Sequence, residues 1–172
     1  MKYMSSCLIA LALSLVATGC KKKTASSQSS ASTSTKPVGE TKNLPKLGIK
    51  IQVPSGATFL NESDHGVDVN FDEAGVQIMK VEGTEPVTFG DAVARAERGE
   101  LCPFGSWIKK DQTPTGWHLE WTCKVGPTAS KTLTNVEVRT IIDGKHFDCG
   151  NQVSSAADVA AVAQTCASVK KL

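Results

Sequence analysis

Histidine and carboxylate side chains are the groups of this 172-residue chain from which acid–base chemistry could start. His146 and Asp148 are the best candidates, because they are separated by one residue and therefore point to the same side of an extended strand. A carboxylate beside a histidine is the arrangement of a general base. The chain contains no Gly-x-Ser-x-Gly motif that would supply a nucleophile. We therefore expect solvated strand residues here and no catalytic residue, and we keep a hydrolase that uses the pair as an alternative.

The first twenty residues have the pattern of an export signal. Lys2 supplies a positive charge, residues 8–17 form an apolar run, and the run leads into Ala17–Cys20. As a helix this run would rise about 15 Å, half of a hydrocarbon core of roughly 30 Å, so it predicts a signal peptide and not a membrane span. The ending resembles the lipobox of bacterial lipoproteins, in which Gly19 would precede the cleavage and Cys20 would become the first residue. An ordinary secretory signal that is cut nearby is the alternative.

The lipobox resemblance implies a signal peptide over residues 1–19 and a lipid-bearing Cys20. The lipid bilayer, contacted through the acylated Cys20, is then one expected partner, and several acyl chains hold a protein to a membrane where one chain binds only marginally. In Gram-negative lipoproteins an aspartate after the cysteine favours retention in the inner membrane. Lys21 stands there instead. The resemblance therefore implies an outer-membrane lipoprotein of the cell envelope that faces the periplasm or the surface.

A polar, positively charged segment follows Cys20. Residues 21–23 are lysines, and nine of the twelve residues in 24–35 are serine or threonine. Such a composition cannot bury enough apolar surface to fold, so we predict a disordered tether over residues 20–45. The remaining segment, 46–172, carries 13 basic and 16 acidic side chains, and aromatic residues make up only 5% of the chain. These values argue against nucleic-acid binding.

Apolar residues in 46–172 follow the periods of regular secondary structure. Alternation predicts strands, and spacings of three and four predict helices. Both predicted helices begin with a capping box, Thr88 with Asp91 and Ser155 with Asp158. The pattern predicts one α+β domain, a mainly antiparallel sheet of about seven strands with two helices packed on it. The predicted strands are 47–53, 67–71, 76–81, 106–112, 117–125, 133–142 and 145–149.

Four cysteines lie in the folded segment: Cys102, Cys123, Cys149 and Cys166. An even set in an exported domain predicts two structural disulfides, with three possible pairings. No Cys-x-x-Cys motif or close pair is present, so we expect neither redox catalysis nor a metal site, and we expect no cofactor. Cys149 ends the last predicted strand and Cys166 lies on the inward stripe of the following helix. We therefore favour Cys149–Cys166, which leaves Cys102–Cys123.

Two tryptophans, Trp117 and Trp121, lie on one side of the same predicted strand. Aromatic side chains on an exposed sheet suit contact with a peptide or a glycan, which makes both residues candidate binding residues. A stripe that continues into Leu119 and Cys123 is more often part of a core. We favour a core location for this stripe.

The order of elements also resembles a known fold family. The beginning of the folded segment (IQVPSGATF), a helix that opens TFGDAVARAE and a closing helix resemble the PsbP-like α/β/α sandwich. The likeness covers most of 46–172 and implies a domain used for binding and assembly rather than catalysis. Fold analogy does not by itself assign a function.

These observations lead to one expected function and two alternatives. We expect a lipid-anchored, non-enzymatic cell-envelope protein whose domain binds a protein, a peptide or a cell-wall partner. The first alternative is a periplasmic inhibitor of a lytic enzyme or protease, which would present one rigid loop at 83–88 or 126–131. The second is the hydrolase that uses His146 and Asp148.

Overall fold

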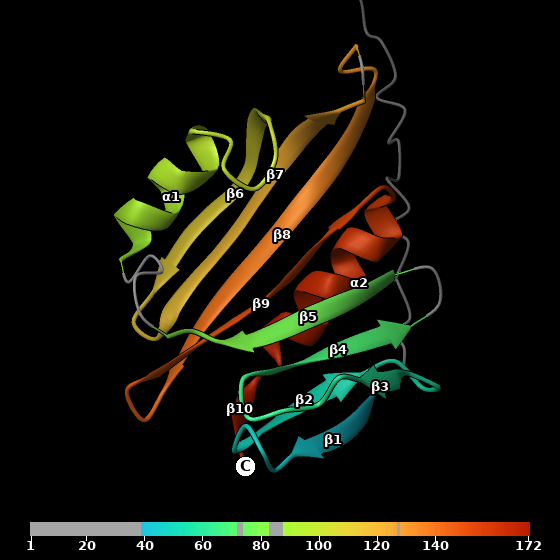
Figure 1. Ribbon diagram of the computed structural model, residues 1–172, viewed down its shortest axis with the longest axis vertical. Coiled ribbons are helices and arrows are strands. Elements are labelled where there is room, and N and C mark those ends of the chain that lie inside the picture. Colours follow the sequence, from blue (N-terminus) through green and yellow to red (C-terminus); the bar gives the residue numbers. More distant parts are fainter. Residues whose placement is uncertain (1–38, 72–73, 83–87, 127) are drawn as a thin grey trace, which may run out of the picture. The chain divides into compact units, whose positions relative to one another are not determined.

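The structure of the protein, a computed structural model, describes residues 39–71, 74–82, 88–126 and 128–172 (Figure 1). These residues form ten strands and two helices and belong to one unit of the chain, residues 36–172. The prediction of an α+β fold with mainly antiparallel pairing is confirmed. The elements are β1 (Glu40–Leu44), β2 (Ile49–Val53), β3 (Thr58–Leu60), β4 (Gly66–Phe71), β5 (Ala74–Lys80), α1 (Phe89–Glu97), β6 (Phe104–Thr113), β7 (Gly116–Val125), β8 (Lys131–Ile142), β9 (Lys145–Val153), α2 (Ala156–Ala167) and β10 (Lys170–Lys171).

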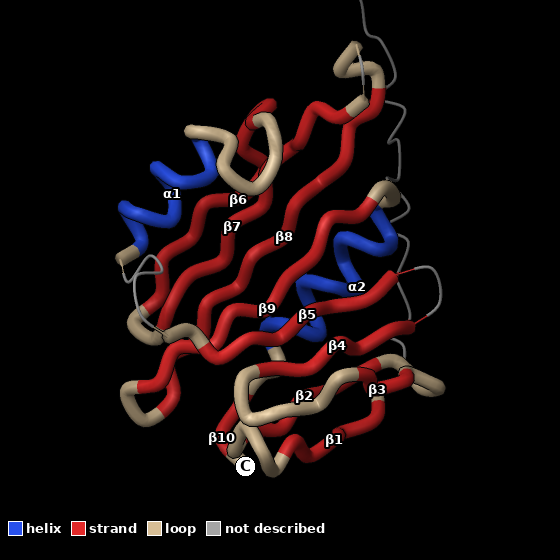
Figure 2. Tube along the Cα trace, in the orientation of Figure 1, coloured by secondary structure: helices blue, strands red, loops and turns tan. Residues whose placement is uncertain are grey.

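Seven strands form one antiparallel sheet in the order β3-β4-β5-β9-β8-β7-β6. Short connections join most neighbours, as expected for antiparallel pairs. Asp143 and Gly144 form the two-residue turn between β8 and β9, and both have positive φ angles (51° and 73°), as a type I′ turn requires. The sheet thus places the long strands β7, β8 and β9 side by side in its middle (Figure 2).

A second, three-stranded sheet has the order β1-β2-β10 and was not expected. The predicted strand over 47–53 lies here as β2 and pairs with β1, so the predicted tether over 20–45 ends too late. Alternation did not reveal β1, because Leu44 is its only buried residue. The short strands β10 of this sheet and β3 of the large sheet were also missed, since they have two and three residues. The folded part therefore begins before residue 46.

The two helices pack on opposite faces of the seven-stranded sheet. In α1, Ala92 and Ala96 pack against the stripe of β7 that contains Trp117 and Trp121. In α2, Val162 packs against the other face, in a core that also contains β2 and so joins the small sheet to the large one. Both helices begin at the predicted capping residues, where Thr88 and Ser155 accept from backbone N–H groups. The prediction of two helices on the sheet is confirmed.

Both predicted disulfides are present. Cys149–Cys166 connects β9 to α2, and Cys102–Cys123 connects the segment after α1 to β7. A regular hairpin would place Ser106 opposite Cys123, but two register shifts between β6 and β7 bring Phe104 there instead. These bulges place Cys102 within reach of its partner.

Candidate functional site

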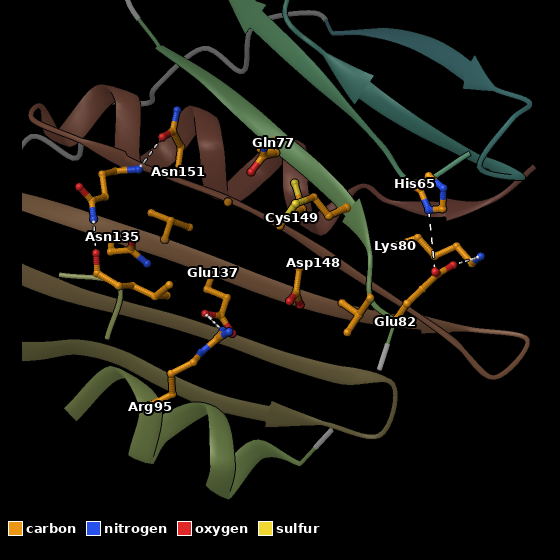
Figure 3. A pocket seen from close by; sticks show the side chains of 16 residues that line it. His65, Gln77, Lys80, Glu82, Arg95, Asn135, Glu137, Asp148, Cys149 and Asn151 are labelled. Atoms are coloured by element: carbon orange, nitrogen blue, oxygen red, sulfur yellow. Dashed lines mark hydrogen bonds and ion pairs between the residues drawn. The ribbon is translucent and has the colours of Figure 1, made fainter. Parts of the chain in front are cut away.

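A cleft of about 540 Å³ opens on the face of the large sheet that carries α1 (Figure 3). The helix packs mainly on β6 and β7, and Arg95 reaches β8, so much of the same face of β8, β9 and β5 is left uncovered beside it. Arg95 of α1 and Leu101 line one wall, and Met79 and Lys80 of β5 line the other. The volume lies in the range of small-ligand sites.

The floor of the cleft is hollow because a glycine lies at its centre. In register, Gln77 of β5 pairs with Gly150 of β9, which pairs with Glu137 of β8. A Cβ atom at position 150 would overlap the carbonyl oxygen of Val136, so no other residue fits this backbone without a shift. The glycine allows the close approach of β8 and leaves a gap between the flanking side chains.

One buried ion pair joins α1 to the floor. Arg95 donates from Nη2 to Oε2 of Glu137 at 2.8 Å, and the indole N–H of Trp117 donates to Oε1 at 3.0 Å. Burial raises the pKa of the Glu137 carboxyl above its usual value, and the Arg95 guanidinium opposes this effect. Both oxygens of the carboxylate therefore have partners within the protein.

A second ion pair continues the network on the same face. Arg139 donates from Nη2 to Oδ2 of Asp148 at 2.6 Å and from Nε to Oδ1, and its guanidinium lies 4.6 Å from the centre of the Trp117 ring. His146 Nδ1 lies 3.4 Å from Nη1 of the same arginine. His146 and Asp148 share a face as predicted, but the arginine binds both carboxylate oxygens. The carboxylate therefore does not orient the histidine as in a general base.

The tryptophan stripe is core. Trp117 is 3% exposed and Trp121 is 0% exposed, so neither presents a surface to a partner. The candidate binding role is therefore wrong, and the core location that we favour for this stripe is what the structure contains. The physical reason is that α1 covers this part of the sheet.

On the opposite face of β7, His118 lies 2.7 Å from Glu120, as the alternation of that strand predicts. Lys109 and Asp111 on β6 stand beside this pair in register. Burial is the main cause that lowers the pKa of His118 below its usual value; Lys109 acts in the same direction, and Glu120 opposes it.

The sequence did not single out Arg95, Asn135, Glu137 or Arg139. In β8 the three polar residues alternate with Val136 and Val138, which is the pattern of any strand with one face in solvent. What makes them a site is the position of α1 beside them, and no spacing in the sequence specifies it.

Several predictions concern residues that the structure does not describe. Cys20, the signal peptide and most of the tether lie outside the described residues, as do 83–87 and 127 of the two loops expected for an inhibitor.

Among the described residues, no group of three or more metal-ligating side chains is present. No helix in the described ranges is long and apolar enough to cross a membrane. No known family model and no curated protein matches the sequence.

Proposed function

We propose that this chain is a lipid-anchored, non-enzymatic binding protein of the cell envelope, and that its partner binds in the cleft beside α1. The partner is a protein, a peptide or a cell-wall component. The single observation that carries the proposal is a cleft of about 540 Å³ whose floor carboxylates are bound by arginines of the same chain. Because both oxygens of Glu137 and of Asp148 are bonded by donors of the protein, neither carboxylate is placed to accept a proton from a bound ligand.

The compartment supports the proposal. Two disulfides indicate an oxidising, extracytoplasmic location for the folded unit. The lipobox-like ending at Cys20 would place the unit beside a membrane, and the lysines at 21–23 would lie against anionic headgroups. A binding domain on such an anchor searches for partners along the membrane and within the length of its tether.

Anchoring is tested by uptake of labelled palmitate in cells that express the chain. The wild-type protein should carry the label, and Cys20→Ala should not, because that side chain is the expected attachment site. Replacing the cysteine also changes the cleavage site, so Lys21→Ser serves as a control that keeps the thiol and should still be labelled. Label that persists in Cys20→Ala contradicts the lipoprotein proposal.

Binding in the cleft is tested with a photoreactive amino acid placed at Leu101 in the intact envelope. Leu101 lines the cleft and is 47% exposed, while Ile108 on the edge strand β6 lies outside it and is 56% exposed. Leu101 and a second cleft position, Met79, should give the same crosslinked species, and Ile108 should give none. Equal crosslinking at all three positions would indicate nonspecific contact with the partner and no binding site in the cleft.

A further inference from the structure

We infer that the cleft binds the backbone of a short peptide through the side-chain amides of Asn135 and Gln152, with an apolar side chain of the peptide between Leu101 and Met79. This inference rests on the proposed function and names the partner class for the same site. It follows from four features of the cleft: an amide without a partner, a second amide beside it, a balance of charge, and two exposed apolar side chains.

Asn135 is the first feature. Its position on β8 directs the side chain to the α1 face, where it lines the cleft (Figure 3). The residue is 7% exposed, and its side-chain amide makes no hydrogen bond with any residue that the structure describes. The amide opens onto the cleft, because its atoms are not among the described buried polar atoms that have no partner. Its donors and acceptor are therefore available to a ligand in the cleft.

Gln152 is the second feature. It pairs with Asn135 in the register of β8 and β9, so the two amides stand side by side on one face. Its Nε2 makes one long contact of 3.5 Å to the carbonyl oxygen of Leu101. A side-chain amide offers both donors and an acceptor, which matches the alternating N–H and C=O groups of a peptide. Two adjacent amides can therefore bond two successive groups of one backbone.

The balance of charge around the cleft is the third feature. Arg95 is matched by Glu137, Lys80 by Glu82 at 2.6 Å, and Asp148 by Arg139 beneath it. Each of these charges has an opposite charge at hydrogen-bond distance, so the lining residues named here offer no uncompensated charge to an ionic ligand. Its remaining capacity is for neutral polar groups.

The fourth feature separates a peptide from a sugar. Leu101 and Met79 lie on opposite walls and are about half exposed, so an apolar side chain between them would be buried on both sides. Sugars commonly stack on tryptophan or tyrosine rings. The lining residues that the structure describes include neither, since Trp117 and Trp121 are buried under α1. The cleft therefore fits a peptide better than a glycan.

The test uses the full lipidated chain in detergent micelles, with nitrogen-15 in its side-chain amides. The probe is an equimolar mixture of tetrapeptides, acetylated and amidated at their ends, with leucine, isoleucine, valine or phenylalanine at the third position. An N-acetylglucosamine trimer is the comparison ligand. The peptides should shift the amide signals of Asn135 and Gln152 in a saturable way and leave Gln112, an exposed amide on β6, unchanged.

Variants locate the binding. Asn135→Ala and Gln152→Ala should each weaken the peptide affinity about ten-fold, since each removes about two hydrogen bonds. Gln112→Ala should bind as the wild type does. Thermal melts identify any variant that fails to fold; the half-buried Gln152 then carries the test in place of Asn135.

Two outcomes would overturn the inference. In one, the sugar trimer shifts the cleft amides and the peptides do not. In the other, both cleft variants bind the peptides with wild-type affinity. If Leu101 and Met79 nevertheless crosslink a partner in the envelope, the proposed function stands and only the peptide class fails. If these positions capture nothing, the proposed function itself fails.

Discussion

Glu137 is a carboxylate whose two oxygens are bonded by groups from different elements, the guanidinium of Arg95 on α1 and the indole of Trp117 on β7. Its side chain is 8% exposed. Removing one member of a buried ion pair leaves the other charge without compensation, which is more damaging than losing a surface pair. Glu137 therefore contributes to stability as well as to the shape of the cleft.

Glu137→Ala should lower the free energy of unfolding by about 3 kcal/mol, because the Trp117 N–H loses its acceptor and Arg95 loses its bond to this carboxylate. Urea denaturation measures the change. Glu100→Ala is the matched control, since it breaks the exposed Arg98–Glu100 pair and should change stability by less than about 0.5 kcal/mol. Similar losses in the two variants would show that burial of the Glu137 pair has no energetic effect.

His118 gives a pH dependence of known sign. Burial lowers its pKa in the folded state, so between this pKa and the ordinary value of 6.5 the unfolded chain binds more protons. Stability should therefore decrease as the pH falls below about 6.5. We expect thermal melts at pH 7.5 and 5.0 to show a smaller decrease for His118→Gln than for the wild type.

The control for this pH experiment is His65→Gln. His65 is exposed on the surface, so its replacement should leave the decrease between the two pH values unchanged. The raised pKa of Glu137 acts in the opposite direction, but it is common to all three proteins and does not affect the comparison. A decrease of equal size in wild type and His118→Gln would contradict the prediction.

At the scale of elements, the disulfide Cys149–Cys166 holds α2 on the sheet. The bond closes a loop with a sequence separation of 17, for which the chain-entropy model gives a stabilisation of about 3 kcal/mol. The double variant C149A/C166A should therefore unfold at lower urea concentration. The double variant C102A/C123A opens a loop of similar length, so it should lose about as much stability as C149A/C166A.

Much of the fold could be predicted from local patterns, and particular elements show why the rest could not. Both helices were predicted because Thr88 and Ser155 begin capping boxes, and the strand over 117–125 because its apolar stripe alternates. The strands β1, β3 and β10 have few buried residues, and tertiary pairing alone makes them strands. The cleft was not predictable, since it depends on where α1 lies on the sheet.

The edge strand β6 has a property that bears on partners. It is ten residues long and mostly exposed, and such an edge can pair with a strand from another chain. Here two register shifts and the charges of Lys109, Lys110 and Asp111 interrupt the edge. These features protect an edge from strand addition, which favours binding in the cleft over binding at the edge.

At the scale of the whole chain, the position of β1 changes where the predicted tether can end. Deleting residues 24–35 should leave the melting temperature unchanged, because the deleted segment precedes every described strand. Deleting residues 40–44 should lower the melting temperature by several degrees, because β2 loses its antiparallel neighbour and Leu44 leaves the core. Calorimetry compares the two deletions. Equal melting temperatures would place the beginning of the folded unit after residue 45.

The core around α2 includes Leu44 and Val169, which lie near opposite ends of the described chain. The small sheet also joins segments that are far apart in the sequence, because β2 lies between β1 and β10. Contacts between residues so far apart in sequence cannot form until almost the whole chain has been synthesised. A chain still emerging from the ribosome therefore lacks a complete core. Under the export that we propose, it would still be unfolded when it is threaded through a narrow channel.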